Sequence, residues 1–201
     1  MDLSLTLIFC LGIGIVSGIN FSKFEVVSKW SLQPYRVVHY KEYYRTLTHA
    51  LFHKDFAHLF FNLYALFGFG SAVEYRMGSS ALYVILFVGA ILFASIPALY
   101  KHKNNYSYSA IGASGGVSAI MMFFMVLFPN SELLFFFVLP LPGWAAVILF
   151  FGLEYYMNKK NRTGIAHDAH IAGAIFGLVF LLILHPIAYL NFFTAVIQSI
   201  F

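Results

Sequence analysis

Charged residues are scarce in this sequence. Asp, Glu, Lys and Arg make up 10% of its 201 residues, whereas a soluble globular domain carries about 25%. No hydrophilic stretch is long enough to fold as a second unit, and 61% of the residues are hydrophobic. The composition excludes an ordinary soluble domain and predicts one integral membrane domain over residues 1–201.

Cysteine and concentrated positive charge are lacking as well. Cys10 is the single cysteine, so no disulfide can form within the chain and the redox compartment cannot be inferred. The net charge is +4, but the basic residues are scattered between hydrophobic segments, which excludes a nucleic-acid partner. The start "MDLSLT" has no basic region, which argues against a cleaved signal peptide. Internal repeats and low-complexity segments are also missing.

What the sequence does contain is a series of long apolar runs. A membrane-spanning helix needs about 20 apolar residues. We predict an all-α integral membrane protein with six transmembrane helices, near residues 3–20, 57–73, 80–100, 112–128, 141–157 and 166–185.

Segments outside these runs carry their own expectations. Pro140, Pro142 and Gly143 indicate that the fifth helix starts about there, with residues 133–139 at the membrane interface. We expect residues 187–201 to form an interfacial helix. The long loop 21–56 between the first two spans should be partly structured, because loops of this length are usually functional or folded.

The stretch "IGASGGVS" at residues 111–118 places one hydroxyl, that of Ser114, among glycines. Its letters also fit G-x-S-x-G, but that nucleophile elbow requires a preceding buried strand, and here the preceding segment is polar. Ser114 instead opens a membrane helix, where unpaired N–H groups and the helix dipole favour negative charge. It is either a nucleophile or a small residue where two helices touch.

A nucleophilic serine needs a base, and His170 at the start of the last span is the candidate. Gly173 and Gly177 follow it with the spacing that lets another helix approach closely, here the helix starting at Ser114. Asp168 falls on the opposite helix face and cannot easily orient His170, so we predict a dyad and not a triad. For His167 we expect a structural or water-binding role.

The second span begins with His58 and Asn62, four residues apart and therefore on one helix face. Both side chains can donate hydrogen bonds to an oxyanion. An interhelical hydrogen-bonded pair would explain them equally well, because polar groups in lipid must find partners.

Taken together, four stretches resemble the rhomboid family of intramembrane serine proteases. They are "YYRTLTHALFHKDFAHLFFN" in the first loop and second span, "GSAVEYRMG" after it, "GASG" at 112–115 and "AHIAGAIFG" at 169–177. The resemblance covers about residues 40–180, and the six-span count is similar to the minimal bacterial form.

The resemblance implies roles for individual residues. Ser114 would be the nucleophile and His170 the base, with His58, Asn62 and the Ser114 backbone N–H assisting the oxyanion. Supporting positions are Gly112, Gly115, Gly173, Gly177, Arg45, Glu74 and Arg76. The family's loop often has Trp-Arg where this chain has Tyr44-Arg45. Some bacterial members carry a tyrosine at the position of Ser118 that packs on the base.

The same resemblance implies a reaction and a setting. We expect hydrolysis of peptide bonds in or near transmembrane segments, without a cofactor or a metal. The partners would be the lipid bilayer and membrane proteins with a helix-destabilised segment and a small residue before the cut. The fifth span and the loop after it would form the gate. The expected location is the cell membrane, as a multi-pass protein, in the bacterial inner membrane.

Two other classes remain as alternatives. A metal-dependent membrane enzyme would use His49, His53 and His58 with His167 and His170, although no H-E-x-x-H is present. A catalytically silent relative would bind membrane helices without cutting them, but such proteins lack the serine or the histidine.

Orientation is the point at which two expectations conflict. Family topology places the N-terminus in the cytoplasm, so the loops 21–56, 101–111 and 158–165 would face outward. These loops carry all the Lys and Arg residues except Arg76, and the positive-inside rule argues for the reverse. Because that rule weakens for long folded loops, we keep the family topology.

Overall fold

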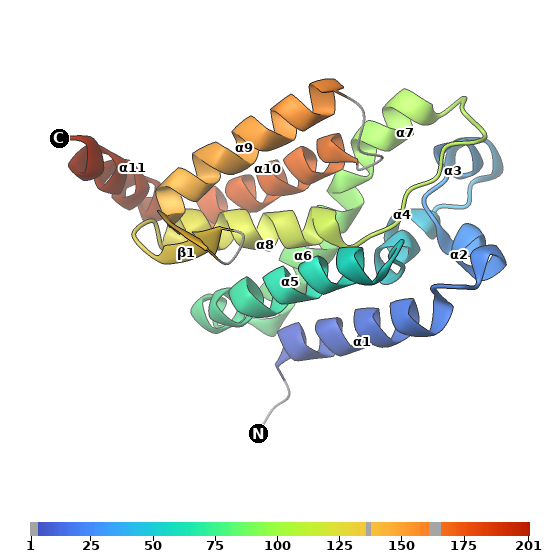
Figure 1. The fold of residues 1–201 in the computed structure, drawn as a ribbon, viewed down its shortest axis with the longest axis horizontal. Coiled ribbons are helices and arrows are strands. Elements are labelled where there is room, and N and C mark those ends of the chain that lie inside the picture. Colours follow the sequence, from blue (N-terminus) through green and yellow to red (C-terminus); the bar gives the residue numbers. More distant parts are fainter. Residues whose placement is uncertain (1–3, 136–137, 161–165) are drawn as a thin grey trace.

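The computed structural model describes residues 4–135, 138–160 and 166–201, and most of it is helical (Figure 1). The predicted spans correspond to α1 (Leu5–Asn20), α5 (Phe56–Met77), α6 (Ser80–Ala94) with α7 (Ile96–His102), α8 (Ser114–Leu127), α9 (Gly143–Lys160) and α10 (His167–Leu184). The first residue of the predicted span 3–20 and residues 161–165 lie outside the described residues. The expected interfacial segment forms α11 (Ile187–Ile200).

Some of these helices are long and apolar enough to cross a membrane. Within the described ranges, three stretches are long and apolar enough to span a bilayer, namely Phe56–Met77, Ser80–His102 and His167–Leu184. Helices α1 and α8 are apolar but shorter. The mostly helical fold is therefore confirmed, with three helical stretches that could cross a membrane, and the count of six spans stays a prediction.

The loop between α1 and α5 is folded, as its length predicts. It contains α2 (Phe24–Trp30), α3 (Pro34–Tyr40), α4 (Arg45–Thr48) and the 3₁₀ helix η1 (His49–Leu51). Arg45 is buried here, and its Nη1 donates to the carbonyls of Ser28 and Ser31 at 2.9 Å each. Its Nε pairs with Glu42 at 2.5 Å. The guanidinium thus ties three parts of the loop together.

Residues before α9, expected at the membrane interface, form a short hairpin that the sequence did not predict. Strand β1 (Glu132–Phe135) pairs antiparallel with β2 (Leu139–Pro142), with Leu133 opposite Leu141. Prolines are tolerated in such a two-stranded hairpin because each strand has an edge that needs no donor. Residues 136–137, inside the stretch 133–139, are outside the described residues. Helix α9 begins at Gly143, as predicted.

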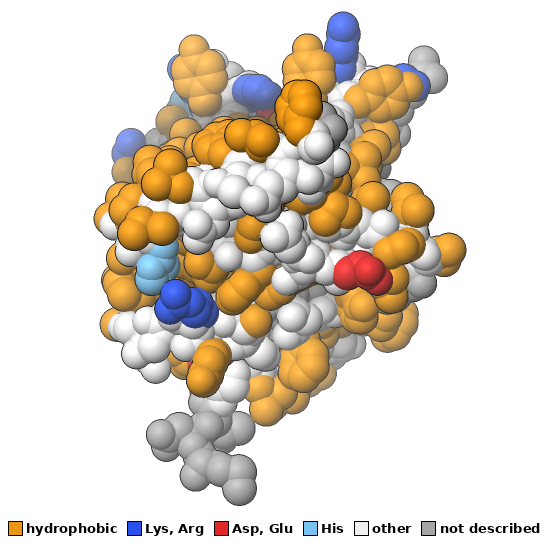
Figure 2. Space-filling model, turned by 90° about the vertical axis from the view of Figure 1, so that its left-hand side faces the viewer, with side chains coloured by type: hydrophobic (Ala, Val, Ile, Leu, Met, Phe, Trp, Pro, Cys, Tyr) orange, Lys and Arg blue, Asp and Glu red, His pale blue; other side chains and the backbone are white. Residues whose placement is uncertain are grey.

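Helix α8 is the centre of the bundle, with α5, α6, α9, α10 and α11 packed around it (Figure 1). Its side chains Ala119, Ile120 and Phe123 are fully buried. Hydrophobic side chains also dominate the outer surface at the left-hand end of the molecule, with only isolated charges (Figure 2). A sequence that is apolar both inside and outside suits a lipid environment.

Candidate active site

Ser114 is the first residue of α8, directly after a turn that only glycine adopts readily. Gly112 has a φ of +129°, and a Cβ there would lie 2.9 Å from Cε1 of His58. The Gly112 N–H donates to the carbonyl of His49 at 3.0 Å. This turn is therefore held by the folded loop before α5, which explains how that loop supports the site.

His170 lies in the first turn of α10 and faces Ser114. Its Nε2 is 2.7 Å from the Ser114 Oγ (residues 56 apart in the chain), which is hydrogen-bond distance. Helices α8 and α10 can approach closely because Gly173 and Gly177 have no side chain. A Cβ at Gly173 would overlap the backbone of Gly115, and a Cβ at Gly177 would overlap that of Ala119. The predicted glycine face of α10 against α8 is confirmed.

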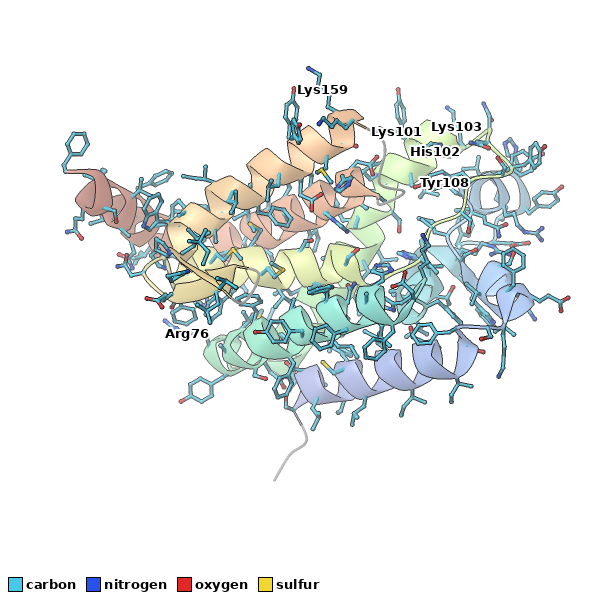
Figure 3. The ribbon with its side chains drawn as sticks, viewed as in Figure 1. Arg76, Lys101, His102, Lys103, Tyr108 and Lys159 are labelled. Carbon is cyan, nitrogen blue, oxygen red and sulfur yellow. The ribbon has the colours of Figure 1, made fainter. Side chains whose placement is uncertain are left out.

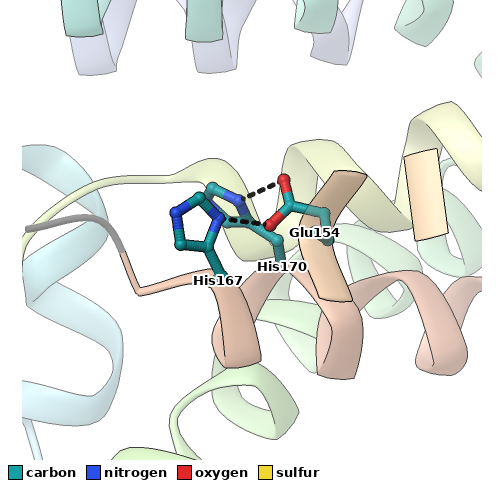
Figure 4. Close-up of side chains that lie close together, drawn as sticks. All are labelled: Glu154, His167 and His170. Atoms are coloured by element: carbon teal, nitrogen blue, oxygen red, sulfur yellow. Dashed lines mark hydrogen bonds and ion pairs between the residues drawn. The ribbon is translucent and has the colours of Figure 1, made fainter. Parts of the chain in front are cut away.

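A third side chain completes the arrangement on the other side of the His170 ring. Glu154 of α9 accepts from His170 Nδ1 through Oε1 at 3.0 Å and from His167 Nδ1 through Oε2 at 2.7 Å (Figure 4). All three side chains are largely buried. Ser114, His170, Glu154 and His167 thus form one continuous row of hydrogen bonds.

Sequence reasoning missed Glu154 but excluded Asp168 as the partner of His170, as the structure shows. Asp168 turns away from His170 and forms an ion pair with Lys101 at 2.8 Å, so it does not orient the ring. His167 binds the carboxylate of Glu154. A signal for Glu154 was available: it is an acidic residue in an otherwise apolar stretch, and ionisable groups within membrane segments are rarely without function.

The expected oxyanion residues lie at the start of α5. Asp55 caps this helix by accepting from the His58 N–H at 2.8 Å. The His58 Nδ1 accepts from the Lys54 N–H at 3.4 Å, so in the neutral ring Nε2 carries the proton. The His58 Nε2 lies 3.1 Å from the position that a Cβ would take at Gly112. It therefore faces the turn that leads into Ser114.

Asn62 lies one turn further along α5 and is buried. Its amide nitrogen donates to the His58 carbonyl at 2.9 Å, within its own helix. The structure therefore brings His58 beside the Ser114 turn, whereas the Asn62 amide is bound to the backbone of α5.

Two loop histidines support the backbone next to the site. His53 Nε2 accepts from the Ala113 N–H at 3.4 Å, and its Nδ1 is 2.9 Å from Ser17 Oγ. Burial lowers the pKa of His53 to about 3, helped by the nearby His58, and burial lowers the pKa of His49 to about 4. Both rings are neutral at pH 7 and act as hydrogen-bonding groups.

Three of the expected supporting residues lie away from Ser114 and His170. Arg45 organises the loop, as described above. Glu74 accepts from Ser4, Leu5 and Thr6 and so holds the first turn of α1. With 1.5 Å of rise per residue, Glu74 lies about 24 Å along α5 from His58. Arg76 lies at that same far end (Figure 3).

A metal could be held at one place in the described part of the chain. Ligand atoms of Glu154, His167 and His170 lie within 4.8 Å of one another, and a carboxylate with two imidazoles is a donor set that Zn²⁺ accepts. The five histidines of the expected metal group do not gather at one place. His167 and His170 lie with Glu154, the rings of His53 and His58 are neighbours with centroids 4.8 Å apart, and His49 contacts Ser95.

Comparison with known proteins shows the family of the chain. The model of the rhomboid domain matches residues 40–187, which is most of the chain. The protein therefore belongs to the rhomboid family, a family of membrane-embedded proteins.

Individual relatives come from mitochondria and from bacteria. An uncharacterized mitochondrial rhomboid protein of Schizosaccharomyces pombe is 29% identical over 197 residues, covering 70% of this chain and 50% of its own length. Rhomboid protein 1 of Saccharomyces cerevisiae, also mitochondrial, is 27% identical over 140 residues, covering 65% and 39%. Rhomboid protease GlpG of Yersinia pseudotuberculosis is 28% identical over 153 residues, covering 76% and 52%. The chain spans about half the length of these curated relatives.

Proposed function

We propose that this protein is an intramembrane serine protease that cuts peptide bonds in or near transmembrane segments, with Ser114 as nucleophile and His170 as base. The single observation that carries the proposal is the 2.7 Å contact between Ser114 Oγ and His170 Nε2 at the start of two closely packed helices. Family membership and the relative named a rhomboid protease support the same class.

The reaction follows from the positions of these groups. As Ser114 Oγ attacks the substrate carbonyl carbon, its proton passes to His170 Nε2, and the carbonyl electron pair moves to the oxygen. The N–H of Ser114, which as a first-turn group has no acceptor within α8, and the Nε2–H of His58 are the proposed donors to that oxyanion. The imidazolium then protonates the leaving amine, and water releases the acyl group.

The substrate is proposed to be a membrane protein whose helix is locally destabilised, with a small residue before the cut. A helix hides its carbonyls in its own hydrogen bonds, and the small residue before the cut is proposed from the resemblance to the rhomboid family. Entry from lipid is proposed at α9, in which Gly143 is the buried residue while most other side chains are partly or fully exposed. We place the protein in a bacterial inner membrane; the relatives named as mitochondrial define the alternative.

Substitution of the two residues tests the proposal. Ser114→Ala and His170→Ala should each abolish cleavage of a membrane-anchored substrate without lowering the melting temperature in detergent. The double variant should be no worse than either single one, because the pair acts as a unit. A fluorophosphonate should label Ser114 only while His170 is present. Full activity in Ser114→Ala would overturn the proposal and leave the binding-only alternative.

A metal-dependent hydrolase is the second candidate, because Glu154, His167 and His170 bring three donors together. The two candidates differ in a simple measurement. Chelators should leave the serine protease fully active, whereas they would inactivate the metalloenzyme, and added Zn²⁺ would restore it.

A further inference from the structure

We infer that Glu154 is a positioning residue whose carboxylate holds the His170 ring in the one orientation and tautomer that can accept the Ser114 proton. This inference rests on the proposed function of Ser114 and His170. It adds a third group, from a third helix, to the predicted dyad.

The hydrogen-bonding capacity of each group decides the tautomer. A carboxylate offers acceptors only, and a neutral imidazole has one donor and one acceptor nitrogen. Since His170 Nδ1 lies 3.0 Å from Glu154 Oε1, Nδ1 carries the proton. Nε2, 2.7 Å from Ser114 Oγ, is left with its lone pair toward the hydroxyl. A general base needs this tautomer.

His167 holds the carboxylate itself in place. Glutamate has three rotatable bonds, and a carboxylate bound at one oxygen could swing away. The His167 Nδ1 at 2.7 Å from Oε2 binds the second oxygen, and the His167 ring is buried at the start of α10. Both oxygens are therefore engaged by residues one helical turn apart, which aims the carboxylate at His170 (Figure 4).

Charge development gives Glu154 a second effect. When the Ser114 proton moves to His170 Nε2, the ring becomes a cation beside the carboxylate, and the attraction is strong in a site largely shielded from water. Glu154 remains ionised throughout, and the proton goes from Ser114 to His170 and then to the leaving amine. The carboxylate thus stabilises the imidazolium without taking up a proton.

Asp168 provides a matched comparison. It is an acid two residues before His170, but its carboxylate faces Lys101. Replacing it removes the same charge from the same region without touching the ring. An effect of Glu154 that Asp168→Asn does not share must therefore come from the contacts of Glu154 with His170 and His167, and not from the lost charge.

The experiment compares Glu154→Gln, Glu154→Asp and Asp168→Asn on a membrane-anchored substrate and on a short extended peptide. Replacement of the acid by its amide in Ser-His-Asp proteases costs about 10⁴ in kcat; here we expect Glu154→Gln to lower kcat by about 10² or more on both substrates, with KM little changed. Glu154→Asp should recover part of kcat, and Asp168→Asn should match the wild type.

The pH profile gives a readout that a loss of stability would not produce. Without the carboxylate the His170 cation is less stable, so the acid limb of kcat/KM should move to lower pH in Glu154→Gln and stay in place in Glu154→Asp. The other titratable groups facing this region are His167 and Asp168 on α10, His58 on α5 and, behind Asp168, Lys101 on α7. They are the same in both variants, so the difference between the variants belongs to position 154.

Several results would overturn the inference. Wild-type kcat and an unmoved acid limb in Glu154→Gln would do so, as would equal losses in Glu154→Gln and Asp168→Asn. Faster cleavage of the membrane substrate with an unchanged peptide rate would make Glu154 a latch that holds α9 closed. Loss of wild-type activity on addition of a chelator would instead make Glu154 a metal ligand.

Two further measurements keep the outcomes distinguishable. If Glu154→Gln does not fold, ¹⁵N NMR of the wild-type His170 ring reports the tautomer directly; a proton on Nε2 at neutral pH would overturn the inference. If Ser114→Ala still cleaves, the proposed function itself fails. If Ser114→Ala is inactive and Glu154→Gln is fully active, the positioning role of Glu154 is refuted and the proposed function stands.

Discussion

At the scale of single residues, His58 faces the turn before Ser114 with the nitrogen that carries a proton, as a donor to an oxyanion must. Loss of one such donor typically costs about 10²–10³ in kcat. We expect His58→Ala to lower kcat by that factor with little change in KM, and Asn62→Ala to lower it as well. The measurement is turnover together with the melting temperature. If the melting temperature falls in proportion to activity, the pair is structural.

His53 makes a second prediction at this scale. Its folded-state pKa of about 3 lies below the ordinary value of 6.5, so the unfolded chain binds more protons between these values. The stabilisation that it contributes is fully present above pH 6.5 and is lost as the pH falls toward 3. We expect the melting temperature in detergent to fall over this window, and His53→Gln to show a shallower fall. An identical pH dependence in both proteins would contradict this assignment.

At the scale of elements, the contact between α8 and α10 sets the distance between Ser114 and His170. A Cβ at Gly173 would overlap the backbone of Gly115, and backbone cannot move aside as a flexible side chain can. We expect Gly173→Ala to cost about 1–3 kcal/mol of stability, in the range of overpacked cores, and to lower activity further than stability alone explains.

The control for this prediction lies on α5. A Cβ at Gly68 would meet no atom within 4 Å, so Gly68→Ala should keep full activity and an unchanged or slightly higher melting temperature. Equal behaviour of the two variants would show that the close approach of α8 and α10 does not position Ser114 and His170 for activity.

At the scale of the whole molecule, charge is divided between the two ends of the bundle. Lys101, Lys103 and Lys159 lie toward one end and Arg76 at the other (Figure 3), and the described face at the Arg76 end is mostly uncharged (Figure 2). The positive-inside rule would place the basic end in the cytoplasm. Family topology places it outside, and the folded loop between α1 and α5 is the kind of segment for which the rule weakens.

Reporter fusions decide between these orientations. With the family topology, alkaline phosphatase fused after residue 100 should be active, since that enzyme matures only outside the cytoplasm, and a fusion after residue 130 should be inactive. Activity of the second fusion alone would reverse the orientation.

The sequence was most informative where a local pattern has one physical solution. Scarce charge and long apolar runs predicted a mostly helical membrane protein, because lipid offers no partners for an unpaired backbone. The spacing of Gly173 and Gly177 predicted the close approach of α10 to the helix of Ser114. The start of α9 at Gly143 followed from the prolines before it.

Other features depend on contacts between distant segments, which local patterns do not encode. Glu154 reaches His170 because α9 packs on α10 with that face inward, and no spacing within either helix specifies such a rotation. The support of the Ser114 turn by His49 and His53 arises in the same way, from a loop that folds back over a different helix. The sequence by itself thus determined the class of protein, its main helices and the catalytic pair that we propose. Only the tertiary structure decided which acid stands behind the histidine, because helix rotation and packing bring the two together.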